Sequence, residues 1–300
     1  MCLTPPKTSI TKKKNWFAKP VNSIKNLISN SYILDRRRIK KKLKSVRYKN
    51  FEVRLAKNFK DIDAAQNLRY KVFYEEMSAN PSSKMKALKR DFDEFDDYWD
   101  HLLVFDNSKS SFKDKVIGTY RLNRKSKAKN YGGFYTAQEY NIDGLLKYPG
   151  EILELGRSCV DKAYRNGQTM QLLWRGIANY VFFYDIEVMF GCASFPGVEV
   201  ESIKTLLSYL YHNHLAPEEI RPVAVEGRYI NMNIIDKEAI NLIETRKKIP
   251  PLIKGYLRLG SFVGDGAVLD KQFDTIDICI VLKTDLVSKR YKSHYETDSL

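Results

Sequence analysis

The chain has 300 residues, of which 43% are hydrophobic and 29% are charged, as in ordinary folded proteins with a sizeable core. Residues 1–50 hold fifteen of the 51 Lys and Arg residues but only one of the 36 Asp and Glu residues, Asp35, so they carry a net charge of +14 and the rest of the chain +1. The excess positive charge therefore belongs to an N-terminal extension. We place this extension at residues 1–48 and a single folded domain at residues 49–300.

The sequence predicts neither a bound metal nor a bound cofactor. The four cysteines are scattered and form no CxxC pair, which argues against a disulfide framework and a zinc site and favours reduced thiols in a cytosolic protein. His212 and His214 have no Cys or acidic residue close by and make a poor metal site. No run of 18 apolar residues occurs, so we expect no transmembrane helix, and polar residues within 16–34 argue against a secretory signal.

The extension has a composition that suits an anionic membrane surface. Apolar residues between Trp16 and Leu34 form a loosely helical stripe, and the basic cluster Arg36–Lys44 follows it. Each cation near such a surface contributes on the order of 1 kcal/mol to binding. We therefore expect a cytoplasmic protein that lies peripherally on the inner face of the cell membrane, with a solvated tail as the alternative. Nucleic acid is disfavoured because the tail matches no nucleic-acid-binding fold.

The domain begins with a predicted strand at Phe51–Ala56, where side chains alternate in character. Asp61 is a candidate N-cap for a helix that runs to Met77. Residues 78–100 resemble a long, polar, acidic loop.

The rest of the domain mixes strands with helices. Strands are predicted at His101–Phe105, Val116–Leu122, Ile152–Val160, Val188–Ser194, Tyr256–Leu259 and Thr275–Leu282. Helices are predicted at Gln168–Tyr184, Val200–His212 and Asp236–Lys247. This mixture favours an α/β or α+β domain with one central sheet.

Four stretches carry a family resemblance. They are RYKVFYEEM (Arg69–Met77), DFDEFDDYWDHLLVFD (Asp91–Asp106), the strand pair IGTYRL and LELGRSCV (Ile117–Leu122 and Leu153–Val160), and the segment Pro250–Leu282. Together they resemble the ornithine–acyl carrier protein N-acyltransferases over residues 51–295. The first three also resemble the acyl-homoserine lactone synthases, but the family-specific C-terminal segment argues against that second reading.

The resemblance implies a GNAT-like fold, in which helices flank a central mixed sheet, and an acyl-phosphopantetheine donor on acyl carrier protein. It also implies transfer of a 3-hydroxyacyl chain to the α-amine of L-ornithine, which forms lyso-ornithine lipid. Another amino-acid acceptor and an inert membrane-surface protein on the same fold remain alternatives.

Amide formation requires a deprotonated amine held against a thioester carbonyl. Glu154 is the candidate general base, and Arg157 is the second candidate catalytic residue. The two have opposite parity on a regular strand, so we predict a bulge near Gly156 that brings both toward one face. A salt bridge at the rim of the sheet is the alternative.

Three arginines, Arg69, Arg121 and Arg157, would by the resemblance line the same cleft. A guanidinium group suits a carboxylate or a phosphate, so one is expected to hold the acceptor carboxylate while others brace the acidic loop. Surface arginines on amphipathic elements are the alternative. Phe73 lies one helical turn beyond Arg69 and is expected in the core or in the cleft wall.

The acidic loop offers carboxylates that could select the second amine of ornithine. By the resemblance we single out Asp93 and Asp96, with a solvated loop as the alternative. The loop lacks the Gly and the terminal Glu of an EF-hand.

The turn RNGQT precedes a predicted helix, whose N-terminus offers backbone N–H groups to a phosphate. Arg165, Gly167 and Gln168 are therefore candidate ligands of the phosphopantetheine phosphate. The second glycine of the usual coenzyme-A loop is absent, which favours a carrier-protein donor. Lys162, Arg165 and Arg175 are candidates for docking an acidic carrier protein.

Overall fold

The computed structural model describes residues 43–286. The apolar stripe and the basic cluster up to residue 42 lie outside the described residues. The first strand, β1 (Val46–Tyr48), pairs with β2 (Phe51–Leu55). The sheet therefore includes three residues that we placed in the N-terminal extension on the basis of charge. No helix within residues 43–286 is both long and apolar enough to cross a membrane.

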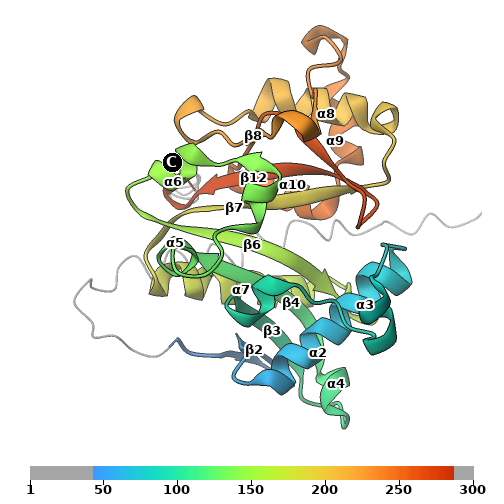
Figure 1. Cartoon of the computed structure of the whole chain (residues 1–300), viewed down its shortest axis with the longest axis vertical. Helices are drawn as coiled ribbons and strands as arrows, with labels where there is room; N and C mark the ends of the chain where they lie inside the picture. Colours follow the sequence, from blue (N-terminus) through green and yellow to red (C-terminus); the bar gives the residue numbers. More distant parts are fainter. Residues whose placement is uncertain (1–42, 287–300) are drawn as a thin grey trace, which may run out of the picture.

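Within the described residues, ten strands form one twisted sheet in the order β1-β2-β3-β4-β6-β7-β12-β11-β9, with β10 beside β12 (Figure 1). Its neighbouring strands are antiparallel, except that β6 and β7 run parallel at the centre. The other strands are β3 (Asp100–Asp106), β4 (Val116–Arg124), β6 (Glu151–Val160), β7 (Ile186–Pro196), β9 (Tyr229–Ile230), β10 (Phe262–Val263), β11 (Ala267–Asp270) and β12 (Thr275–Lys283), and β5 (Tyr140–Asn141) and β8 (Val223–Ala224) form a separate pair.

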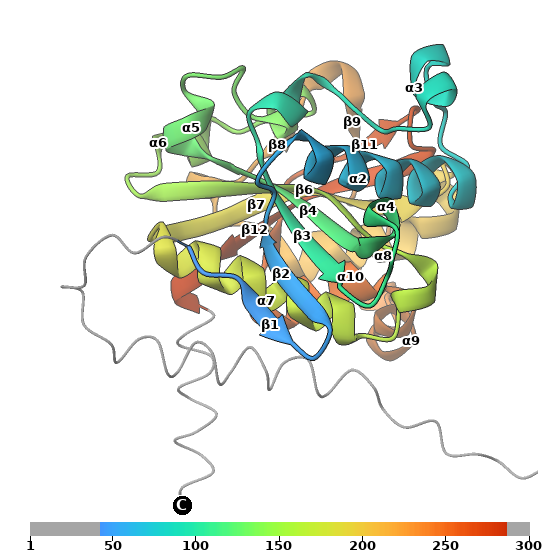
Figure 2. The same cartoon turned by 90° about the horizontal axis from the view of Figure 1, so that it is seen from below.

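Helices cover both faces of the sheet, so β4 and β12 are buried along nearly their whole length. Helix α2 (Phe59–Tyr70) lies on one face and α7 (Gln168–Phe183) on the other (Figure 2). On the α7 side, α8 (Val200–His214), α9 (Leu242–Lys248) and α10 (Pro251–Leu259) complete the cover. Short helices are α3 (Ser83–Leu88), α4 (Phe112–Lys115), α5 (Lys125–Ala128) and α6 (Asp143–Lys147), and 3₁₀ turns are η2 (Glu94–Asp97), η3 (Tyr135–Gln138), η4 (Lys162–Tyr164), η5 (Glu218–Ile220), η6 (Glu226–Arg228) and η7 (Lys237–Ala239).

The predicted strand at Tyr256–Leu259 is wrong, because these residues form the end of α10. Pro251 occupies the first turn of this helix, where a backbone N–H would have no intrahelical acceptor, so proline costs no hydrogen bond there. Gly260 ends the helix with φ +94, a left-handed conformation that glycine adopts without strain. Ile253, Tyr256 and Leu257 are all buried, as helical spacing requires for a single apolar face.

The other corrections concern helix boundaries. Asn58, and not Asp61, caps α2, and the buried Asp61 instead pairs with Arg54 at 2.6 Å. The helix then continues as a π-helical turn, η1 (Lys71–Glu76), close to its predicted end. The acidic loop at residues 78–100 contains α3 and η2, and the helix predicted from residue 236 begins only at Leu242, where Asn241 caps it.

The predicted bulge near Gly156 is confirmed. Arg121 lies opposite Gly156 and Thr119 opposite Cys159, so two residues of β6, Arg157 and Ser158, stand against one residue of β4. Arg157 adopts φ +49, in the left-handed region that non-glycine residues rarely occupy.

The sheet opens between β6 and β7. Their pairing ends at Glu154 and Phe190, although the strands continue to Val160 and Pro196. Gly191 follows the last paired residue at φ +155, and a Cβ there would lie 2.1 Å from the carbonyl oxygen of Leu155. Only glycine allows this close approach, beyond which the two strands diverge.

Candidate active site

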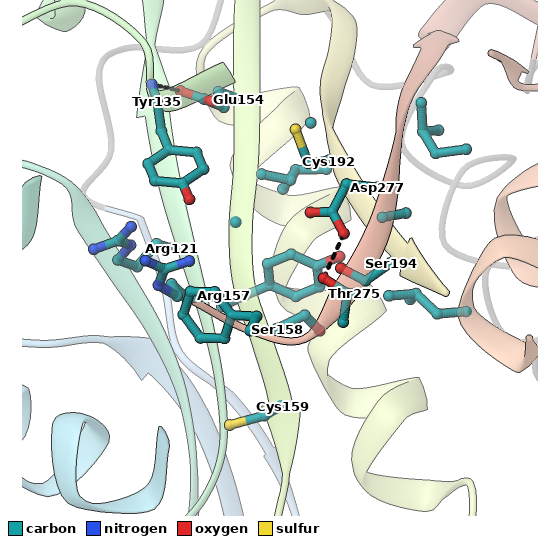
Figure 3. A pocket seen from close by; sticks show the side chains of 18 of the residues that line it. Arg121, Tyr135, Glu154, Arg157, Ser158, Cys159, Cys192, Ser194, Thr275 and Asp277 are labelled. Carbon is teal, nitrogen blue, oxygen red and sulfur yellow. Dashed lines mark hydrogen bonds between the residues drawn. The ribbon is translucent and has the colours of Figure 1, made fainter. Parts of the chain in front are cut away.

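A cavity of about 370 Å³ lies between the diverging ends of β6 and β7 (Figure 3). Its wall includes Phe73 and Arg121 from the α2 side of the sheet and Leu252 and Tyr256 of α10 from the opposite side. The cavity therefore crosses the sheet. Among the candidates from the sequence, the residues that line it are Phe73, Arg121, Glu154, Arg157 and Arg165.

Glu154 is buried in the cavity wall, where its carboxylate accepts three hydrogen bonds. The backbone N–H of Tyr135 donates to Oε2 at 3.0 Å, and the N–H and hydroxyl of Thr136 donate to Oε1 at 2.6 and 2.5 Å. Burial raises the pKa of Glu154 to about 7, even though these hydrogen bonds and the charge of Arg121 oppose the shift. A carboxyl group with this pKa can accept a proton near neutral pH.

The acidic loop folds inward onto the arginines. Arg69, which is fully buried, donates to Asp91 at 2.6 Å and to both carboxylate oxygens of Asp96 at 2.7 and 2.9 Å. Arg121 also donates to Asp96, at 3.1 Å. Burial alone would raise the pKa of Asp96, but these two guanidinium groups hold it well below its usual value.

Asp93 joins this network from a turn that its own side chain helps to form. Its carboxylate accepts from the N–H of Phe95 at 3.0 Å, and its own N–H donates to Oδ2 of Asp96 at 3.2 Å. Arg121 and Arg157 both donate to its carboxylate, and their charges lower the pKa of Asp93 although burial raises it. Three arginines thus face three aspartates behind the cavity. The sequence did not decide which arginines brace the acidic loop, and the structure pairs Asp93 and Asp96 with these three.

The bulge directs Arg157 into the cavity wall. Its guanidinium lies 5.0 Å from the ring centre of Tyr135 and 4.4 Å from that of Phe273. Together with Asp91 and Asp93, these contacts fix the side chain from several sides. Arg157 is therefore a positioned cationic group at the edge of the cavity.

The turn before α7 lies beside the same cavity. Gly167 is the N-cap of α7 at φ +85, and the position of a Cβ on Gly167 is open space. Asn166 accepts from the N–H of Gln168 at 3.1 Å. Arg165 donates to Glu76 at 2.6 Å and to the carbonyl of Val160 at 3.0 Å. Gly167 and Gln168 thus lie at a helix N-terminus that is accessible to an anion.

Sequence reasoning did not identify several residues of the site. Tyr135 supports Glu154 through its backbone, and Figure 3 shows its hydroxyl directed into the cavity. Asp270 and Asp277 also line the cavity, from β11 and β12. Their strand segments read as core, and only the pairing of β11 with β12 and of β12 with β7 brings them to the site.

The comparisons with known proteins agree with this geometry. The family description "Acetyltransferase (GNAT) domain" matches residues 68–175, from the last turn of α2 to the first half of α7. Fold and family together define the chain as an acyltransferase with the GNAT fold.

Closely similar relatives narrow the class. An L-ornithine N(alpha)-acyltransferase of Agrobacterium fabrum is 46% identical over 247 residues, which cover 81% of this chain and 84% of that protein. Proteins of the same name from Rhizobium meliloti and Brucella abortus are 45% and 44% identical, covering 84% and 83% of this chain and 86% and 90% of theirs. The chain belongs to the L-ornithine N(alpha)-acyltransferase family.

Proposed function

We propose that this protein transfers an acyl chain from the phosphopantetheine thioester of acyl carrier protein to the α-amine of L-ornithine, forming lyso-ornithine lipid. The observation that carries the proposal is the cavity between β6 and β7, with the buried Glu154 in its wall, in a chain of this family. The acceptor is ornithine because relatives that share 44–46% of the sequence carry that name.

The opening in the sheet supports a pantetheine arm as the donor. Beyond Glu154 the edge of β6 that faces β7 has lost its strand partner, so an extended ligand with amide groups can take that place. Met170, Leu252 and Ile280 give the cavity an apolar region for an acyl chain. The phosphate would lie near Arg165, Gly167 and Gln168, and Lys162, Arg165 and Arg175 would meet the acidic carrier protein.

Glu154 acts as the general base in the proposed reaction. The α-amine loses a proton to Glu154, directly or through one water, and its nitrogen attacks the thioester carbonyl. The C–N bond forms and the C–S bond breaks. The second proton of the nitrogen passes to the departing thiolate, and the first leaves Glu154 for solvent. Arg157 contributes to the reaction by holding the acceptor carboxylate, which positions the α-amine for the attack.

The arginine–aspartate network positions this machinery. Arg121 and Arg157 are the cations in the cavity wall that an acceptor carboxylate can reach, and Phe73 forms part of the same wall. Asp93 and Asp96 are engaged with arginines, which favours bracing over direct contact with the second amine of ornithine. Arg69 holds the loop in place from behind.

The N-terminal extension would keep the enzyme at an anionic membrane on the cytoplasmic side. The support is the net charge of +14 on residues 1–50, beside an apolar stripe. A lipid product would then leave directly into the bilayer.

The test is to incubate the purified protein with 3-hydroxyacyl carrier protein and a panel of amino acids, and to identify products by mass spectrometry. We expect acylation that depends on the acceptor and is best with ornithine, with matching release of carrier-protein thiol. Equal turnover with S-adenosylmethionine would instead indicate a homoserine lactone synthase, and no turnover with any amino acid would refute the proposal.

A further inference from the structure

Three carboxylates from distant parts of the chain meet at the cavity. They belong to Glu139, which follows η3, to Asp270 at the end of β11, and to Asp277 in β12. One oxygen from each lies within 4.8 Å of the others. All three residues are buried, with exposed fractions of 2%, 7% and 5%, and Asp270 and Asp277 form part of the cavity wall.

This acidic group lacks the counter-charges that the Arg69 network has. Among the described residues, Arg228 is the cation paired with it, at 3.2 Å from Glu139. Neutral donors serve the others: the hydroxyl of Thr275 bonds to Asp277 at 2.8 Å, and the backbone N–H groups of Gln272 and Phe273 bond to Oδ1 of Asp270.

The second oxygen of Asp270, Oδ2, accepts none of the hydrogen bonds found within residues 43–286, although the residue is 93% buried and lines the cavity. Because this oxygen is not fully enclosed and Asp270 lines the cavity, a ligand there can donate a hydrogen bond to it. Burial and the neighbouring acids raise the pKa of Asp277 to about 7, and burial raises the pKa of Glu139. Ser194, which also lines the cavity, is a second neutral donor to Asp277, so what the site lacks is positive charge.

We propose that Asp270 and Asp277, supported by Glu139, bind the side-chain ammonium of the acceptor and so select a diamino acid. This inference rests on the proposed function and goes further, because it assigns the acceptor's second amine to β11 and β12 and not to the acidic loop. An ammonium group donates three hydrogen bonds, which carboxylates arranged around it can accept.

The opposite wall fits the other end of such an acceptor. Arg157 and Asp277 line the same cavity, and Figure 3 shows them on opposite sides of the β6 ribbon, with the hydroxyl of Tyr135 on the Arg157 side. An amino acid whose carboxylate lies at Arg157 extends its side chain toward Asp277. The α-amine then lies between the two charged ends, on the side of the cavity where Glu154 is found.

The experiment compares L-ornithine with L-norvaline, which has the same carbon chain but no side-chain amine. The wild-type enzyme should prefer ornithine by at least about 10²-fold in kcat/KM, because hydrogen bonds to charged groups contribute strongly. Asp277→Asn should lower kcat/KM for ornithine about 10–100-fold and leave norvaline within about 3-fold. Asp270→Asn should act in the same direction. Asp97→Asn, on the exposed part of the acidic loop, should leave kcat/KM unchanged for both acceptors.

Several outcomes would overturn the assignment. One is equal use of ornithine and norvaline by the wild-type enzyme. Another is an equal fall in kcat/KM for ornithine and norvaline in a folded Asp277→Asn protein, since that would indicate a general structural role. Loss of activity on treatment with a chelator would show that the carboxylates hold a divalent cation instead. If the wild-type enzyme acylates no amino acid at all, the proposed function fails first, so the two failures are distinguishable.

Discussion

Replacing Glu154 with Gln separates the catalytic role of this carboxyl group from its structural one. The amide has nearly the same shape, and its oxygen can still accept from the N–H and hydroxyl of Thr136. Its nitrogen cannot accept from the N–H of Tyr135, so one hydrogen bond of 3.0 Å is lost. The amide also cannot take a proton from an amine, so turnover at neutral pH should fall by about 10²–10⁴-fold.

The same substitution changes how stability depends on pH. The pKa of Glu154 is about 7 in the folded chain and 4.5 when unperturbed, so the folded state favours the protonated form. The resulting stability is fully present below pH 4.5 and is lost as pH rises through 7, a total of about 3 kcal/mol. Between pH 5.5 and 8 the wild-type protein should lose about 2 kcal/mol from this group, and Glu154→Gln should not.

Two measurements check the prediction. The first is kcat/KM for ornithine between pH 5.5 and 9, where the wild-type value should rise through pH 7 and the defect of the variant should shrink as the amine deprotonates unaided. The second is urea unfolding of both proteins at pH 5.5 and pH 8. Near-wild-type turnover in a folded Glu154→Gln protein would remove Glu154 from the mechanism. Parallel stability profiles would show that its pKa is close to the ordinary value.

Three further changes test other parts of the structure. Arg69→Met should cost about 3–5 kcal/mol in urea unfolding because it removes the buried guanidinium group that bonds both Asp91 and Asp96 and leaves a negative charge uncompensated, whereas Arg47→Met, 77% exposed, should cost under about 1 kcal/mol. Gly191→Ala should destabilise the fold by about 1–3 kcal/mol because its Cβ would lie 2.1 Å from a backbone carbonyl oxygen, while Gly227→Ala, where the Cβ position is open space, should be nearly neutral. Equal effects of the two substitutions would refute the claim that β6 and β7 approach closely only because residue 191 is glycine. Removing residues 1–42 should preserve acylation in detergent but weaken salt-sensitive binding to anionic vesicles, and identical, salt-independent binding would place the membrane contact on the folded domain.

The sequence predicts much of the central sheet because its strands have local signatures. The strands predicted at Phe51–Ala56 and Thr275–Leu282 end within one residue of the observed strands β2 and β12. Tyr256–Leu259 failed because four apolar-rich residues fit either a strand or the last turn of a helix. The flanking Pro251 and Gly260 were the signals that distinguish the two.

The candidate site is harder to predict because its contacts are non-local. Six acidic residues close together resemble a solvated loop, and nothing near them in sequence shows that Arg121 and Arg157 will form ion pairs with three of them. The family resemblance, and not the charge pattern, placed Glu154 in the cleft. Asp277 had no comparable signal, since a single acid within an apolar strand has no visible partner until Asp270 and Glu139 are brought beside it.

The interlocked arginines and aspartates behind the cavity also bear on how this enzyme can change during evolution. Arg69, Arg121 and Arg157 share their three aspartates, so the loss of any one charge leaves an opposite charge in this network uncompensated. A single substitution in this network therefore destabilises the protein, and only paired replacements that keep the charges balanced avoid that loss. The cavity wall at β11 and β12 has no such shared bonds to arginine. New acceptor preferences should therefore arise by drift at that wall while the charged frame stays fixed.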